Sequence, residues 1–158
     1  MEPIFITQEQ KDLLLKDLCA RLPYGVKVQN IYNTETIGRL RSIDLDDYCY
    51  EIMFYTYEGK ALTVCDRSKL FRFGKVLRYK PYLFPMSSMT EEQQKEYRKV
   101  CDLDMEILEN RPMRGEPFPA MYNSQDWLDA HHFDYRGLIP MGLGIDATGL
   151  DIYTNSNE

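Results

Sequence analysis

The side chains best suited to acid/base chemistry or ligand binding lie close together in residues 123–139, NSQDWLDAHHFDYRGLI. This stretch holds the only tryptophan of the chain and both of its histidines. Because imidazole changes its charge near neutral pH, it can transfer protons or, when neutral, bind a metal ion. The first hypothesis is therefore an acid/base or metal site built from Asp129, His131, His132 and Asp134.

The competing interpretation is a structural corner made of two short helices. Trp127 and His131 are four residues apart, so they would stack on one face of a helix, as would Leu128 and His132. Asp134 would cap a second helix that starts at Tyr135. Adjacent histidines point in different directions on a helix, and no HExxH pattern accompanies them.

The structural interpretation is favoured, so the sequence predicts no metal, no cofactor and no catalytic residue. The same stretch still offers side chains that can both pack and hydrogen-bond, which makes it the candidate binding site. Its candidate residues are Trp127, His131, His132, Asp134, Tyr135 and Arg136.

A helix and a set of short strands precede this stretch. Thr7 and Gln10 form a capping box that begins a helix ending near Arg21. Its apolar stripe is Leu14, Leu18 and Leu22, with Leu15 and Cys19. Strands are predicted over residues 26–31, 36–43, 48–57, 61–65 and 71–79. They form either a small SH3-like barrel or an open twisted sheet packed on the helix.

Helical structure dominates the rest of the chain. Residues 80–85 are predicted to be an extended linker, because prolines bias the residues before them away from helix. Thr90 and Gln93 form a second capping box, which begins a helix that runs to about Leu108. The sequence therefore predicts an α+β protein. Residues 1–80 are a helix with an antiparallel sheet, and residues 81–158 are a linker and a helical subdomain whose tail, 151–158, is frayed.

Charge is divided unevenly along a chain whose net charge is −6. Residues 1–86 carry 13 basic and 11 acidic residues, whereas residues 87–158 carry 6 and 14. Between residues 60 and 80, seven bases stand against one acid and alternate with aromatic residues. Such a stretch can bind nucleic acid. The residues of this alternative are Arg67, Lys69, Arg72, Lys75 and Arg78, and the overall negative charge disfavours it.

The sequence predicts no targeting signal. No apolar run approaches 18 residues, and the first ten residues have no basic region followed by an apolar one. We therefore expect a cytoplasmic protein of a bacterial cell. The four cysteines lack CxxC spacing, so they are predicted to be reduced and buried.

Three blocks of the chain resemble a group of short bacterial proteins. The blocks are LCARLPYGVKV (18–28), KPYLFPMSSMTEEQQKEY (80–97) and DWLDAHHFDYRGLIPMGLGIDA (126–147). The group is abundant in gut Bacteroidales, often in prophage-like or mobile regions, and has no assigned activity. The resemblance thus transfers no catalytic residue, and it implies an accessory protein of a phage or mobile element.

Three functions compete. A non-enzymatic protein-interaction module is favoured, because no catalytic motif stands out and aromatic residues are common in binding hot spots. Its surface would be the sheet face with Tyr48, Tyr50, Tyr55 and Tyr57, or residues 80–84. Nucleic-acid binding is the alternative, and an enzyme that uses His131 or His132 is the third.

Overall fold

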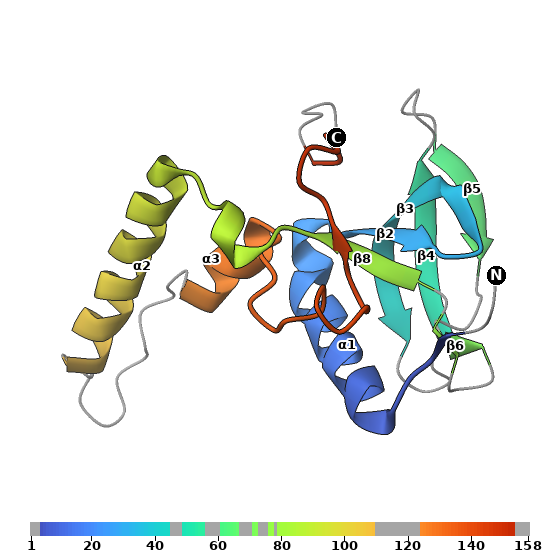
Figure 1. Ribbon diagram of the computed structural model, residues 1–158, viewed down its shortest axis with the longest axis horizontal. Helices are drawn as coiled ribbons and strands as arrows, with labels where there is room; N and C mark the ends of the chain where they lie inside the picture. Colours follow the sequence, from blue (N-terminus) through green and yellow to red (C-terminus); the bar gives the residue numbers. More distant parts are fainter. Residues whose placement is uncertain are drawn as a thin grey trace.

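The chain folds as an α+β protein, as the sequence predicts (Figure 1). The computed structural model describes residues 4–44, 49–55, 61–66, 71–72, 76–77, 79–109 and 124–153. Its helices are α1 (Gln8–Arg21), η1 (Leu22–Tyr24), η2 (Met86–Ser88), α2 (Glu91–Glu109) and α3 (Ser124–Ala130). Its strands are β1 (Ile4–Phe5), β2 (Lys27–Asn30), β3 (Asn33–Asp44), β4 (Cys49–Tyr55), β5 (Ala61–Asp66), β6 (Phe71–Arg72), β7 (Val76–Leu77), β8 (Tyr79–Leu83) and β9 (Ile145–Asp146).

Local sequence signals set the starts of the long helices. At α1, the Thr7 hydroxyl accepts from the Gln10 amide at 3.1 Å, and the Gln10 side chain accepts from the Thr7 amide at 3.0 Å. Thr90 and Gln93 make the same reciprocal pair before α2. Both predicted capping boxes are confirmed, because each needs only residues three apart.

The described strands pair into two sheets. The larger has the order β5-β4-β3-β2-β8-β9, and the smaller has the order β1-β7-β6. Pairing is antiparallel except between β8 and β9, which are parallel. The strands predicted over residues 26–31, 36–43, 48–57 and 61–65 are confirmed as β2 to β5 where they are described, whereas the predicted strand 71–79 is divided among β6, β7 and the start of β8. The pairings between described residues do not join the two sheets into a closed barrel.

The predicted linker at residues 80–85 is wrong, because most of it belongs to β8, which lies between β2 and β9. Pro81, Tyr82 and Leu83 are buried. Pro81 is paired with Val28, where antiparallel partners need not exchange hydrogen bonds, so the missing N–H is tolerated. The extended backbone that proline favours suits a strand as well as a linker.

The main core draws on both sides of the predicted boundary at residue 80. Leu14 and Leu18 of α1 lie in it without solvent exposure, together with residues of β2, β3, β7 and β8. Leu138 and Leu143 from the last part of the chain complete the same core. The division into residues 1–80 and 81–158 stays a prediction about domains, although these contacts join the two parts.

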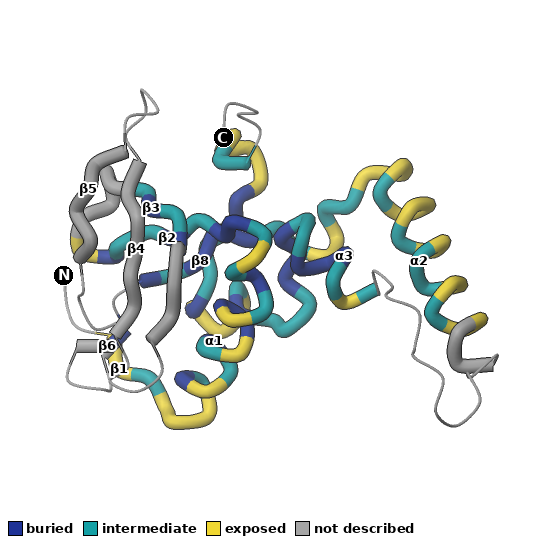
Figure 2. The backbone as a smooth tube through the Cα atoms, turned by 180° about the vertical axis from the view of Figure 1, so that it is seen from behind, coloured by how far each residue is buried: buried dark blue, intermediate teal, exposed yellow. Residues whose placement is uncertain are grey.

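A second apolar cluster joins α2 to α3. Trp127, Leu128 and Phe133 are buried in it, and Tyr97 and Val100 of α2 pack against them. Between residues 91 and 106, every α2 residue is exposed or half-buried, as the yellow and teal tube of Figure 2 shows. Over residues 91–106, α2 therefore contacts the described part of the protein along one side.

Three further predictions are corrected. No second helix follows α3, because residues 135–142 form turns in which Gly137 and Gly142 have positive φ angles. Residues 151–153 are not frayed, because Tyr153 is bonded to β2 and β8. The cysteines were predicted to be buried, but Cys19 is exposed and Cys101 is half-buried.

Within the described ranges, no helix combines the length and apolar character needed to cross a membrane.

Candidate functional site

Two side chains of α2 fix the position of α3. The backbone N–H of Ser124 donates to the Asp104 carboxylate at 2.8 Å, so α2 satisfies one free donor of the first turn of α3. Trp127 Nε1 donates to Glu96 Oε1 at 3.1 Å. Asn123, whose residue type also favours the cap position, lies outside the described residues.

Trp127 is the centre of an aromatic stack and is 1% exposed. The His131 ring lies 4.0 Å from it at an interplanar angle of 23°, which confirms the predicted stacking. Phe133 is nearly parallel to Trp127 at 5.8 Å, and Tyr97 reaches it at 5.4 Å. Trp127 therefore anchors α2 to α3, and its ring is not available to an external ligand.

The two histidines have different surroundings. His131 Nδ1 lies 2.8 Å from the Trp127 carbonyl, which can only accept, so this nitrogen carries the proton. His132 follows the end of α3 with a φ angle of +62° and stacks on Tyr153 at 3.8 Å. The predicted stacking of His132 on Leu128 is therefore wrong. Because the helix stops at Ala130, its four-residue spacing no longer applies.

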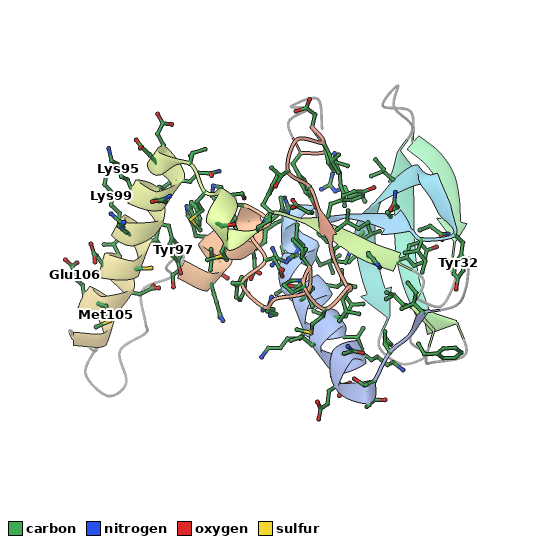
Figure 3. All side chains as sticks on the ribbon, in the orientation of Figure 1. Tyr32, Lys95, Tyr97, Lys99, Met105 and Glu106 are labelled. Carbon is green, nitrogen blue, oxygen red and sulfur yellow. The ribbon has the colours of Figure 1, made fainter. Side chains whose placement is uncertain are left out.

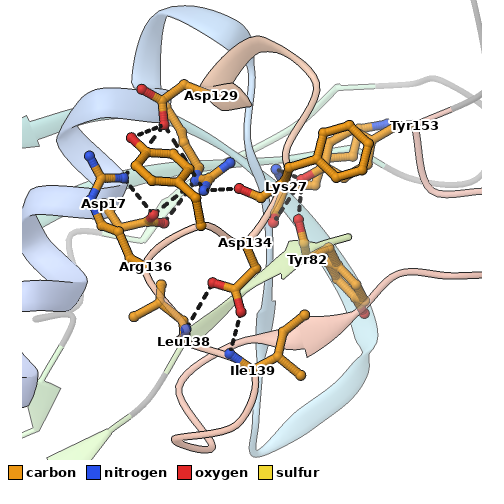
Figure 4. Close-up of polar contacts among 12 residues, drawn as sticks. Asp17, Lys27, Tyr82, Asp129, Asp134, Arg136, Leu138, Ile139 and Tyr153 are labelled. Carbon is orange, nitrogen blue, oxygen red and sulfur yellow. Dashed lines mark hydrogen bonds and ion pairs between the residues drawn. The ribbon is translucent and has the colours of Figure 1, made fainter. Parts of the chain in front are cut away.

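Three buried charged side chains and the half-buried Arg136 form a network between α1 and the region of α3 (Figure 4). Arg21 Nε donates to both carboxylate oxygens of Asp17, at 3.0 and 2.9 Å. Arg136 Nη1 donates to Asp17 at 2.8 Å and lies 3.5 Å from Asp129 Oδ1. The Tyr135 hydroxyl donates to the same Asp129 oxygen at 2.9 Å. Two acids and two bases thus neutralise one another.

Arg21 also fixes the backbone after α3. Its Nη2 atom donates to the Phe133 carbonyl at 2.6 Å, and the whole side chain is buried. The Tyr135 ring lies 5.5 Å from the Arg21 guanidinium carbon and 4.4 Å from that of Arg136, within cation–π range of both. The network therefore attaches residues 133–136 to α1.

Burial dominates the electrostatics of this network. It raises the pKa of the Asp17 carboxyl, and the charges of Arg21 and Arg136 oppose that rise. Burial and the hydrogen bond to Asp129 raise the pKa of the Tyr135 hydroxyl. Burial disfavours the charge of Arg136, but its hydrogen bond to Asp17 and the charges of Asp17, Tyr135 and Asp129 together outweigh that cost and raise its pKa. Because these side chains are held in hydrogen bonds and ion pairs, they are better suited to fixing the backbone than to transferring protons.

Asp134 performs a different structural task. Its two carboxylate oxygens accept from the backbone N–H groups of Leu138 and Ile139, at 2.8 and 2.9 Å. Its own backbone N–H donates to the Phe84 carbonyl at 2.8 Å. Asp134 therefore stabilises the turn that places Leu138 in the core, where the sequence had predicted a helix cap.

Burial lowers the pKa of His132 from 6.5 to about 3, and the charges of Arg21, His131 and Lys27 add to this effect. The unfolded chain therefore binds this proton more readily than the folded protein. The stabilising contribution is complete above pH 6.5 and decreases as the pH falls toward 3. Between about pH 7 and pH 5 we expect a loss of about 2 kcal/mol in unfolding free energy from this group.

The check is urea unfolding at both pH values. His132→Asn should remove this loss, since asparagine tolerates a positive φ angle and does not titrate. His131→Asn serves as the matched control and should keep it. Asp17 titrates in the opposite sense, so the comparison uses only variants that keep Asp17. Equal pH dependence in wild type and His132→Asn would contradict the prediction.

The structure therefore brings part of the predicted site together. His131 and Trp127 meet in the aromatic stack, and Tyr135 and Arg136 meet in the charge network. His132 and Asp134 point to separate partners. Within the described ranges, no group of three histidine, cysteine or acidic side chains is arranged to hold a metal ion.

The remaining predicted surfaces are untested or corrected. Arg67, Lys69, Lys75 and Arg78 lie outside the described residues, and of Arg72 only the backbone is described. Tyr48 and Tyr57 also lie outside the described residues, and of Tyr50 and Tyr55 only the backbone is described. Residues 80–84 do not form an exposed binding surface, because they are mostly buried in β8.

The sequence did not predict which residues of other helices and strands contact the candidate site. Asp17 and Arg21 were not among the predicted site residues, yet both are fully buried. The available signal was their position three and seven residues after Leu14, within its stripe. Lys27, Tyr82 and Tyr153 gave no comparable signal, because their contacts join residues far apart in the sequence.

The fold and the site define an α+β protein whose last third is attached to its first helix by a neutral buried charge network. In comparisons with known proteins, no family model, no curated protein and no solved structure matches the chain.

Proposed function

We propose that this chain is a non-enzymatic protein-interaction module whose recognition surface is the outer face of α2. The setting implied by the sequence resemblance, an accessory role in a phage or mobile element, is part of this proposal. The observation that carries it is the position of α2. One side of the helix is fixed by the aromatic stack, and the other side faces outward (Figure 3).

The outer face is defined here by Lys95, Lys99, Leu103 and Glu106. They are spaced by four, four and three residues, so they lie on one side of a helix. Figure 3 shows Lys95, Lys99 and Glu106 pointing away from α3, whereas Tyr97 points toward it. Leu103 is 44% exposed among these charges, and the neighbouring Met105 is 56% exposed.

This face has the features of a protein-binding surface. Lys95 and Lys99 come before Glu106 along the helix. A partner surface with acidic groups opposite the lysines and a basic group opposite Glu106 would therefore be attracted and oriented by these charges. Leu103 supplies apolar area at the centre, and methionine adapts its shape to different neighbours. Of the candidate catalytic groups, Asp129, His131 and Asp134 are engaged in internal bonds and His132 is buried, which supports binding over catalysis as the function.

We expect Leu103→Gln and the double variant Lys95→Glu/Lys99→Glu to weaken partner binding at least about tenfold, the effect of losing a hot spot. The measurement is capture from a native host lysate with and without nuclease, followed by the Kd of each recovered protein. Lys16→Glu is the matched control, because Lys16 is an exposed lysine on α1. Binding that is equal in all variants would contradict the proposed surface.

The nuclease treatment also separates the alternative function. Recovery that disappears with nuclease and weakens with rising salt would favour nucleic-acid binding through residues 60–80. Recovery that survives nuclease but fails in the α2 variants would favour the interaction module.

A further inference from the structure

One side of α2 carries its charges in a segregated order. Lys95, Lys99, Asp102 and Glu106 are all exposed. Their spacing of four, three and four residues is that of the positions along which two helices pair in a coiled coil, with charges here in place of the usual apolar residues. Since successive residues are rotated by about 100°, the four side chains lie within about 60° of one another around the helix axis. We call this row the charged seam.

The order of charges in the seam is unfavourable for an isolated helix. Lys95 and Lys99 are four residues apart, as are Asp102 and Glu106, and like charges at this spacing repel each other. Acidic side chains near a helix C-terminus also oppose the helix dipole, and the last turn of α2 contains no basic residue. A partner that brings the opposite charge to each of these positions would relieve this repulsion.

A second copy of the chain brings these charges when its α2 runs antiparallel to the first. The spacing of the seam reads the same in both directions, so one register sets Lys95 opposite Glu106 and Lys99 opposite Asp102 of the other copy. Two-fold symmetry repeats both pairs, which gives four contacts between opposite charges. A parallel pair would set like charges opposite each other, so the seam selects the antiparallel order.

The position of α2 allows this approach. α2 lies at one end of the longest axis of the molecule in Figure 1, and Lys95, Lys99 and Glu106 point away from α3 in Figure 3. Leu103 and Met105, 44% and 56% exposed, lie on the two flanks of the seam and would add apolar contact. Glu106 also has an interaction within its own chain, and a carboxylate has enough acceptor sites to keep it while accepting from a second lysine.

We infer that the outer face of α2 binds a second copy of this chain, antiparallel and through the charged seam. This inference rests on the proposed function, because it uses the same face and names its partner. Exposed ion pairs are individually weak, so we expect a Kd of about 0.1–1 mM near 0.1 M salt. At this salt concentration the Debye length is about 10 Å, so the net charge of −6 on each chain is screened more than the contacts of the seam.

The test mixes two charge variants of the full chain in sedimentation velocity. Lys95→Glu/Lys99→Glu makes the seam wholly acidic, and Asp102→Lys/Glu106→Lys makes it wholly basic. Each variant alone should associate at least about tenfold more weakly than the wild type, whereas the two together should form a one-to-one complex at least as tight as the wild-type dimer. Lys16→Glu, on the exposed side of α1, is the control and should associate like the wild type.

A fourth variant separates loss of pairing from loss of folding. Lys95→Glu/Lys99→Glu/Asp102→Lys/Glu106→Lys reverses the order of charges in the seam, so it should associate with itself like the wild type but not with the wild type. Raising the salt from about 0.1 M to about 0.5 M should weaken every one of these complexes, because exposed charges are screened.

A wild type that stays monomeric at roughly 1 mM would overturn the inference, as would acidic and basic variants that do not bind each other. The proposed function fails by a different result, since capture of another protein by the outer face of α2 does not require self-association. A monomeric wild type whose captured partner is lost in the α2 variants would keep the interaction module and discard the second copy as its partner.

Discussion

Replacement of Arg21 by methionine is expected to lower the free energy of unfolding by about 3–5 kcal/mol. Methionine retains much of the length and the apolar contacts of the arginine stem. It removes the guanidinium that donates to both oxygens of Asp17 and to the Phe133 carbonyl. Asp17 is fully buried, so it would lose a counter-charge where water cannot replace it. The measurement is urea unfolding near neutral pH.

The pH dependence of this loss distinguishes electrostatics from packing. Arg21 opposes the rise that burial causes in the pKa of Asp17, so its removal raises that pKa further. The folded variant then binds the Asp17 proton more readily than the unfolded chain, and it gains stability as the pH falls toward 3.8. The difference from the wild type should therefore be smaller near about pH 4.5 than near about pH 7.

Two controls complete this experiment. Arg21→Lys keeps the charge but not the planar set of donors, so we expect an intermediate loss of about 1–3 kcal/mol. Lys16→Met changes an exposed base on the same helix and should shift stability by less than about 0.5 kcal/mol. A loss below about 1 kcal/mol in Arg21→Met, or one that does not vary with pH, would contradict the role given to this network.

Replacement of Trp127 by alanine is expected to cost about 3–5 kcal/mol and to loosen α2 from the rest of the protein. Trp127 packs against His131, Phe133 and Tyr97, and its indole N–H donates to Glu96. Two of these partners, Tyr97 and Glu96, belong to α2. The cavity would therefore lie at the junction that holds this helix.

Thermal unfolding followed by circular dichroism measures the overall loss, because the variant lacks the only tryptophan. Hydrogen exchange measures the local effect, and α2 amides should exchange faster relative to those of α1. Leu103→Ala is the matched control on the opposite side of α2, where the side chain is 44% exposed, and a loss below about 1 kcal/mol is expected. Equal protection of α2 in the wild type and Trp127→Ala would contradict the anchoring role.

Features that depend on neighbouring residues could be predicted from the sequence. The two capping boxes need partners three residues apart, and the stack of Trp127 on His131 needs partners one helical turn apart. The run of apolar and aromatic residues likewise predicted β2 to β5 of the larger sheet. In each case the physical cause lies within one element, so the order of residues suffices to identify it.

Other features were decided only by the tertiary structure. Residues 80–85 had the prolines of a linker, but β2 and β9 provide partners that make most of them a buried strand. Residues 151–153 had the composition of a frayed end, but the Tyr153 hydroxyl accepts from the Lys27 N–H of β2 and donates to the Tyr82 carbonyl of β8.

The candidate site shows the same division between local and distant causes. Its residues on α3 and in the following turn were predicted as a group, because they are close in sequence. Their partners Asp17 and Arg21 lie more than 100 residues earlier, and only the fold brings them to Arg136 and Phe133. A buried charge is tolerated only where an opposite charge and hydrogen bonds meet it. Therefore the sequence by itself determined which groups could be charged, and the tertiary structure decided which of them could be buried.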